Sequence, residues 1–231
     1  MKVSQEFSKN AHTYSKHNVI QNKVLDKLLL HVEGKPQHIV DLGCGSGELI
    51  RKIDWDYKHF IGVDFAKGML ELHPKSPKIE LIYGDFNNQS LFDYLSTCKI
   101  DYLLSSSALQ WAEDLEQIFK NISGLKVPFA LSIFTSNTFK TLNKTANLTP
   151  LLKSSSYIYE LQKKYFDAKF EVVEYRLDFD STRDMFRYIK KSGVSGSRKT
   201  LNYKQTKDLM KNYPLSYLEF EVVFVSSSFS I

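Results

Sequence analysis

Residues 38–47 read His38-Ile39-Val40-Asp41-Leu42-Gly43-Cys44-Gly45-Ser46-Gly47, an apolar run that leads directly into a turn with glycine at every second position. Glycine adopts backbone angles that a Cβ disfavours, and it lets a ligand approach the main chain closely. Residues 48–53, which follow, read as a helix. A strand, a glycine turn and a helix in this order hold a nucleotide-like ligand at the end of a parallel strand.

The spacing of the glycines distinguishes between ligands. A dinucleotide-binding turn has the pattern G-x-G-x-x-G and holds a pyrophosphate at the helix N-terminus. Here the pattern is G-x-G-x-G, and Asp41 precedes it. A carboxylate repels a phosphate but attracts a ligand that carries an ammonium group. The motif resembles D-x-G-C-G-x-G, the first motif of the class I S-adenosylmethionine (SAM) methyltransferases, which implies SAM as the cofactor. The alternative is an ordinary strand-to-helix turn.

Composition limits the classes of protein that fit this chain. With 231 residues, of which 42% are hydrophobic, it is long enough for one α/β domain with an elaboration. The net charge of +5 favours an anionic partner only weakly. Two distant cysteines, Cys44 and Cys98, fit a reducing compartment, and the six histidines show no metal-binding spacing, so we expect no metal. We expect one domain over residues 1–231 and a monomer.

The start of the chain carries no apolar core of the kind that a signal peptide has. No run of residues approaches the roughly 20 apolar residues of a membrane helix. We therefore expect a cytoplasmic protein that does not bind a membrane.

Short apolar runs alternate with helical segments through the first 134 residues. The expected strands are 38–42, 60–64, 79–83, 100–104 and 129–134, preceded by an amphipathic helix near 17–32. This alternation predicts a parallel sheet covered on both faces. Two later runs, 170–179 and 218–229, are expected to close the sheet. The predicted fold is α/β and Rossmann-like, a seven-stranded mostly parallel sheet with an antiparallel last strand. An N-terminal lid helix falls within 1–33, and helical cap insertions fall within 136–168 and 181–215.

Acidic residues follow the second and third expected strands, at the edge of the sheet where ligands bind. Asp64 comes about twenty residues after the first glycine turn, where Rossmann-like folds place an acid on the ribose. Asp85 would accept a hydrogen bond from the exocyclic amine of adenine, and Phe86 would donate its backbone N–H to a ring nitrogen. Phe65 could pack on the adenine face. The alternatives are a solvated acid for Asp64, ordinary turn chemistry for Asp85 and a core position for Phe65.

The segment after the fourth expected strand reads Ser105-Ser106-Ser107-Ala108-Leu109-Gln110-Trp111. In folds of this kind the methyl group and its acceptor meet here. Trp111 offers an apolar wall, and Gln110 offers an amide that can hold an acceptor oxygen. The alternative for Trp111 is an ordinary core residue at the start of a helix.

Three blocks resemble the malonyl-acyl-carrier-protein O-methyltransferases, the BioC family of biotin synthesis. The first is Phe7, Ala11, Tyr14, Asn18 and Gln21, which resembles F-x3-A-x2-Y-x6-Q at the start of that family. The second is A-L-Q-W at 108–111, which trans-aconitate methyltransferases share, and the third is the closing stretch 217–224, which resembles L-x-Y-E-V-x-F. The chain departs from the family at Ala66, where the family usually has serine, and in its serines before A-L-Q-W, where asparagine is common.

The resemblance implies methylation of the free carboxylate of malonyl-acyl carrier protein, with Tyr14 in a lid. We expect a cap arginine to orient the carboxylate, since its planar fork matches a carboxylate. Arg198 is the assigned residue, with Arg183 and Arg187 as alternatives. The pairs 190–191 and 198–199 could contact the acidic carrier protein, or they form a solvated face.

The sequence thus yields two sets of site residues. The catalytic set is Tyr14, Gln110, Trp111 and Arg198. The SAM-binding set is Gln21, Asp41, Gly43, Cys44, Gly45, Gly47, Asp64, Phe65, Met69, Asp85, Phe86 and Ser105. The alternatives are a small-acid carboxyl methyltransferase of the trans-aconitate type and a SAM-fold binding module without chemistry. A nucleic-acid methyltransferase is disfavoured, because the chain lacks the N-P-P-[YF] block and is only mildly basic.

Overall fold

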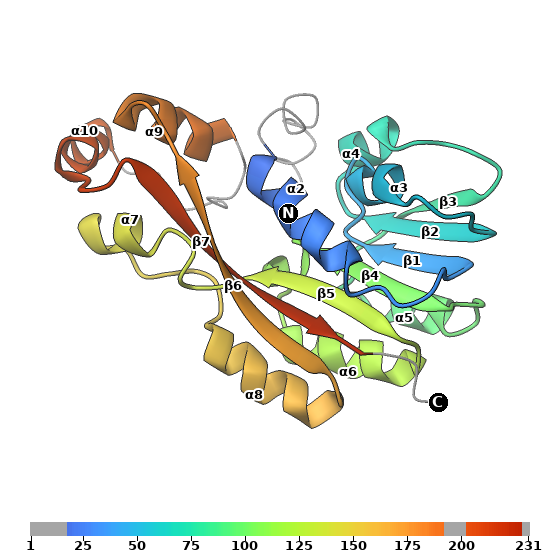
Figure 1. The fold of residues 1–231 in the computed structure, drawn as a ribbon. Helices are drawn as coiled ribbons and strands as arrows, with labels where there is room; N and C mark the ends of the chain where they lie inside the picture. Colours follow the sequence, from blue (N-terminus) through green and yellow to red (C-terminus); the bar gives the residue numbers. More distant parts are fainter. Residues whose placement is uncertain (1–17, 192–201, 228–231) are drawn as a thin grey trace.

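The computed structural model describes residues 18–191 and 202–227, and within them seven strands form one sheet (Figure 1). The strands are β1 (His38–Leu42), β2 (His59–Asp64), β3 (Ile79–Tyr83), β4 (Tyr102–Ser106), β5 (Phe129–Phe134), β6 (Lys169–Asp178) and β7 (Tyr217–Ser226). Their order across the sheet is β3-β2-β1-β4-β5-β7-β6. Strands β1 to β5 pair in parallel, and β7 runs antiparallel to both β5 and β6. The predicted fold class is therefore confirmed.

Helices cover both faces of the sheet (Figure 1). They are α2 (Val19–Leu29), α3 (Glu48–Lys52), α4 (Lys67–Leu72), α5 (Gln89–Leu95), α6 (Leu115–Leu125), α7 (Lys140–Thr145), α8 (Ser155–Tyr165), α9 (Thr182–Lys191) and α10 (Tyr203–Asn212), with a 3-10 turn, η2 (Leu109–Trp111). One core cluster joins α2 and α3 to the sheet, and a second joins α5, α6 and α8 to its other face. Figure 1 shows α7, α9 and α10 gathered around the end of the long β6–β7 pair. None of the helices in the described ranges is both long and apolar enough to cross a membrane.

The helix expected near 17–32 is α2, and it packs against the sheet through one apolar face. Ile20, Val24, Leu25 and Leu28 are buried against the sheet, at the spacing of one helix face. Asn18 stands at the N-cap position, yet its side chain makes no capping hydrogen bond. The Asn18 side chain is thus available to something other than the helix.

Strand β4 differs from the expected strand by two residues at each end. Its pairing with β5 continues through Ser105 and Ser106, opposite Leu131 and Ser132. The predicted edge therefore falls after Ser106, and Ser105 lies within the sheet. This shift changes which serine reaches the site.

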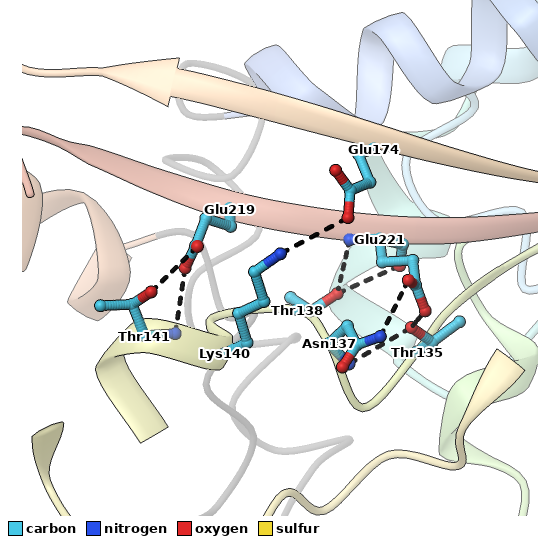
Figure 2. A network of polar contacts seen from close by, with 8 residues as sticks. All are labelled: Thr135, Asn137, Thr138, Lys140, Thr141, Glu174, Glu219 and Glu221. Carbon is cyan, nitrogen blue, oxygen red and sulfur yellow. Dashed lines mark hydrogen bonds and ion pairs between the residues drawn. The ribbon is translucent and has the colours of Figure 1, made fainter. Parts of the chain in front are cut away.

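The segment that follows β5 is tied to β7 by two glutamates (Figure 2). Glu221 is buried, and its carboxylate accepts hydrogen bonds from Thr135 Oγ1 at 2.5 Å and Asn137 Nδ2 at 2.9 Å. Glu219 accepts from the backbone N–H and the hydroxyl of Thr141, at 3.0 and 2.9 Å. Two carboxylates of one strand thereby fix the path of the chain from the carboxyl end of β5 into α7.

Candidate SAM and acceptor site

One cavity lies at the carboxyl ends of β1, β2 and β4, beside the start of α2. Of the residues assigned from the sequence, those that line it are Gln21, Asp41, Gly43, Cys44, Gly45, Asp64, Phe65, Met69, Phe86 and Trp111. Lining residues outside those assignments include Asn18, Asn22, Glu48, Ser106, Ser107 and Ala108. The cavity thus joins the glycine turn to the segment after β4, where we expected the acceptor.

The glycine turn brings the backbone of β1 against the segment after β4. Gly43 has a φ of +79°, and a Cβ built on it would lie 2.3 Å from the Cβ of Ala108. The N–H groups of Gly43 and Cys44 both donate to the carbonyl oxygen of Val63, at 2.8 and 3.0 Å. Glycine is required at position 43 both by the backbone angle and by the close approach.

Asp64 is buried at the end of β2, and backbone donors hold its carboxylate in place. Its Oδ2 accepts from Gly45 N at 2.9 Å, and its Oδ1 accepts from Ala66 N at 2.7 Å. Burial raises the pKa of Asp64 to about 6, while the N–H donors of Ala66 and Gly45 act in the opposite direction. Each carboxylate oxygen can accept more than one hydrogen bond, so Asp64 keeps capacity for two ribose hydroxyls.

Asp41 is the most perturbed acid of the cavity. Burial, followed by the charge of Asp64, raises its pKa to about 8. Its Oδ1 is buried and has no hydrogen-bond partner among the described residues, and the same holds for Asn18 Oδ1 and Gln21 Oε1. Three buried acceptor oxygens in one cavity fit a ligand with an ammonium group, because an unpaired buried acceptor is costly.

The thiol of Cys44 also lines the cavity, but it is no nucleophile. Burial, with the charges of Asp41 and Asp64, raises the pKa of Cys44 well above its usual range. Cys44 therefore contributes a neutral wall.

Four of the assigned residues that the structure describes do not line the cavity. Ser105 is fully buried, and its hydroxyl donates to the carbonyl oxygen of Leu42 at 2.7 Å, because β4 runs one residue beyond it. Asp85 Oδ1 accepts from the N–H and the side-chain amide of Asn87, at 2.9 and 2.7 Å. Gly47 is the N-cap of α3. Gln110 donates from Nε2 to the carbonyl oxygen of Ser107 at 2.5 Å, which leaves its Oε1 buried without a partner in the described structure.

The segment after β4 reaches the cavity through serines that the sequence did not single out. Ser106 and Ser107 line the cavity in place of Ser105, because the β4–β5 ladder extends through Ser106. The sequence indicates Asn18 only as part of an N-terminal pattern, and no helix-capping hydrogen bond holds its side chain. Apart from their place in a run of three serines, nothing in the sequence marks Ser106 or Ser107 as a site residue.

The candidate cap arginines that the structure describes do not line the cavity. Tyr14 and Arg198 lie outside the described residues, as does the pair 198–199. Arg183 and Arg187 lie in α9, where Arg187 Nη1 pairs with Asp184 at 2.7 Å, and neither arginine lines the cavity. The pair 190–191 ends the same helix. The expectation that a cap arginine orients the acceptor carboxylate therefore stays a prediction.

Comparisons with known proteins agree with this geometry. Residues 39–128 match the family described as methyltransferase domain. A malonyl-[acyl-carrier protein] O-methyltransferase of Acinetobacter baylyi is 26% identical over 95% of this chain and 88% of its own length. Malonyl-[acyl-carrier protein] O-methyltransferase 1 of Ilyobacter polytropus is 27% identical over 88% of this chain and 80% of its own.

A solved structure shares the fold at much lower sequence identity. It is the plantazolicin methyltransferase BpumL in complex with a triazolic desmethylPZN analog and SAH, with a TM-score of 0.57 and 14% identity. The match covers 98% of this chain and 95% of that one. The arrangement of strands and helices found here is therefore one that occurs in a methyltransferase.

Proposed function

We propose that this chain is a class I SAM-dependent methyltransferase that methylates the carboxylate of malonyl-acyl carrier protein, because relatives over most of its length are named malonyl-[acyl-carrier protein] O-methyltransferases and residues 39–128 match a methyltransferase domain. The observation that carries the proposal is the extent of this similarity, which reaches well beyond residues 39–128. The product would be a methyl ester, formed at an early step of biotin synthesis.

The residues of the cavity fit SAM, which supplies a methyl group on a sulfonium that is an activated leaving group. In this proposal Asp41, Asn18 and Gln21 hold the ammonium group, because their buried oxygens have no partner among the described residues. Asp64 holds the ribose hydroxyls. The side chains of Phe65, Met69 and Phe86 surround the adenine ring. Asp64 and Glu48, joined by Asp41 once it ionises on binding, give this cavity a negative charge that matches a cationic cofactor.

The chemistry makes modest demands on the protein. A carboxylate is already a nucleophile at neutral pH, so no general base is needed. The main task is to bring the reactants together in line, which is worth up to ~7–11 kcal/mol in well-aligned cases. Trp111 provides an apolar wall beside the acceptor in this proposal, and burial of the acceptor carboxylate away from water assists the reaction.

Methyl transfer from labelled SAM tests this function. Wild-type protein is incubated with malonyl-acyl carrier protein, malonyl-CoA, free malonate or trans-aconitate, and base-labile methyl groups are counted on each. We expect labelling of the carrier-protein thioester at the lowest acceptor concentration. Labelling of the free diacids alone would favour the trans-aconitate type, and labelling of none would overturn the carboxyl-methyltransferase proposal.

SAM binding is measured separately by calorimetry. We expect wild-type protein to bind SAM and Asp64→Ala to bind at least tenfold more weakly, because the ribose hydroxyls lose a charged partner. A wild-type protein that binds no SAM would instead indicate a binding module without chemistry.

Carrier protein as the macromolecular partner has its own test. The chain is basic overall, and we propose that cations of the cap contact the acidic carrier protein. Binding should weaken between low and moderate salt, because exposed charges are screened over about 10 Å at 0.1 M ionic strength. Affinity that does not change with salt would contradict an electrostatic contact.

A further inference from the structure

Ser107 carries a buried hydroxyl with no assigned task. Its Oγ is buried and has no hydrogen-bond partner among the described residues, and the residue lines the cavity. A hydroxyl offers one donor hydrogen and two acceptor lone pairs. Leaving such a group unpaired inside a protein costs free energy, so an unpaired hydroxyl in a ligand cavity points to a partner on the ligand.

The backbone of Ser107 adopts a conformation that serine rarely takes. Its φ is +57°, in the left-handed region, which is uncommon for a residue with a Cβ. Two contacts hold it there, since its N–H donates to the carbonyl oxygen of Ser132 at 3.0 Å and to Ser132 Oγ at 3.2 Å. Its own carbonyl oxygen accepts from Gln110 Nε2 at 2.5 Å. Strained residues held by their surroundings are common at functional sites, where the geometry itself is used.

The charge of the lining residues bears on how the cavity can bind an acceptor carboxylate. The described residues that line it include Asp41, Glu48 and Asp64, and none of them is lysine, arginine or histidine. A carboxylate acceptor that enters would meet repulsion from these acids, offset by the positive charge of SAM. Because the described lining has no cationic side chain, only its uncharged hydrogen-bond donors can bind the acceptor carboxylate.

We propose that Ser107 binds the methyl acceptor, by donating its hydroxyl hydrogen to an oxygen of the acceptor carboxylate. This inference rests on the proposed function, because it takes the acceptor to be a carboxylate. The hydrogen bond from Gln110 Nε2 to the carbonyl oxygen of Ser107 ties the backbone of Ser107 to the segment 108–111. Ala108, the next residue, contacts Gly43, so Ser107 lies directly beside the glycine turn assigned to SAM.

Two substitutions separate the hydroxyl from the backbone. Ser107→Ala removes the hydroxyl and keeps a Cβ in the left-handed region, whereas Ser107→Gly removes the hydroxyl and relieves the strain. Lys126→Gly is the matched control, because Lys126 has a φ of +54° at the end of α6 and does not line the cavity. All three proteins are compared with wild type by thermal unfolding, SAM calorimetry and methyl transfer to malonyl-acyl carrier protein.

We expect both Ser107 variants to raise the KM for the acceptor, or to lower kcat/KM, by roughly tenfold or more. Their affinity for SAM should stay within about twofold of wild type. The control Lys126→Gly should keep both its SAM affinity and its methyl-transfer activity within about twofold of wild type. Ser107→Gly should unfold no earlier than wild type, which excludes loss of folding as the cause. A direct binding measurement with SAH-loaded protein and malonyl-acyl carrier protein should show the same loss without any chemistry.

The outcomes separate this inference from the function on which it rests. If wild type labels a different carboxylate acceptor, the variants are assayed on that acceptor, and the same loss would support the role of Ser107. If both Ser107 variants keep kcat/KM within about twofold of wild type, or lose SAM affinity as strongly as activity, the acceptor role is overturned. If wild type labels no acceptor, the proposed function fails and this inference fails with it.

Discussion

Asp41 in β1 and Asp64 at the end of β2 are both buried, and after burial itself the charge of Asp64 is what raises the pKa of Asp41, to about 8. Two carboxyl groups in one cavity are unfavourable without a cation between them. This arrangement suits a cationic ligand, because a bound positive charge offsets both the desolvation of the two carboxylates and the repulsion between them. The ligand-free protein therefore carries a free-energy cost that the ligand removes.

The first prediction concerns the stability of the ligand-free protein. The pKa of Asp41 is higher in the folded state than in an unfolded chain, so the folded state binds more protons and its stability falls as the pH rises from about 4 to about 8. Asp41→Asn cannot ionise and should be more stable than wild type at pH 8, by about 2 kcal/mol, with a smaller difference at pH 5. Urea unfolding at the two pH values measures this. A variant no more stable than wild type at pH 8 would contradict the buried charge.

The second prediction concerns ligand affinity. Asp41 must be ionised to pair with an ammonium group, and below pH 8 the free carboxyl is largely protonated. Binding of SAH should therefore strengthen as the pH rises from 6 to about 7.5, by up to tenfold per pH unit, with release of a proton. The gain ends near pH 8, where the amino group of the ligand itself loses its proton.

Calorimetry in buffers of different ionisation enthalpy measures both the affinity and the proton release. Asp41→Asn should bind SAH more weakly and with little dependence on pH over this range. An equal pH dependence in variant and wild type would assign the effect to another group.

The third prediction concerns the contact between the glycine turn and the segment after β4. Gly43→Ala places a Cβ 2.3 Å from the Cβ of Ala108 and at a φ of +79°, so we expect at least a tenfold loss of SAM affinity and a lower Tm. Gly34→Ala is the matched control, since Gly34 has a φ of +74°, its Cβ would meet nothing within 4 Å, and it does not line the cavity. Adding Ala108→Gly to Gly43→Ala should restore part of the loss, because it removes the clash. Equal effects of the Gly43 and Gly34 substitutions would show that crowding is not the cause.

The sequence predicted those parts of the site that depend on local pattern. The apolar run before Gly43 and the acid after the second strand fixed where Asp41 and Asp64 stand, because parallel strands bring their carboxyl ends to one edge. Ser105 lies within the sheet and does not line the cavity, because β4 continues two residues beyond the end that the sequence predicted. Ser106 and Ser107 reach the edge instead.

Other parts depend on contacts between distant segments and carry no local signal. The unpaired amide oxygen of Asn18 can be recognised only when α2 is packed against β4 and β5, and the unpaired hydroxyl of Ser107 only when β5 holds its backbone. Likewise, Glu221 belongs to a closing strand that the sequence matched to a family block, yet its partners Thr135 and Asn137 are more than eighty residues away. These positions depend on tertiary packing between distant segments, which cannot be predicted from the residue pattern of one segment alone.

The last prediction concerns that buried glutamate. Its two carboxylate oxygens accept from two different donors, so Glu221→Gln replaces one acceptor with an amide that faces a donor (Figure 2). We expect a loss of about 1–3 kcal/mol in the free energy of unfolding. Glu174→Gln is the matched control on β6, where an exposed pair with Lys140 at 3.5 Å should contribute less than about 1 kcal/mol.

Denaturant unfolding and SAM calorimetry together identify the role of this network. Glu221 and its partners do not line the cavity, so the variant should keep its SAM affinity while it loses stability. Thr135→Ala combined with Glu221→Gln should cost less than the sum of the two single changes, because both remove the same hydrogen bond. If Glu221→Gln is as stable as Glu174→Gln, the carboxylate does not anchor the segment after β5. If SAM affinity falls with stability, the anchor reaches the cavity through β5 itself, whose Ser132 holds the backbone of Ser107.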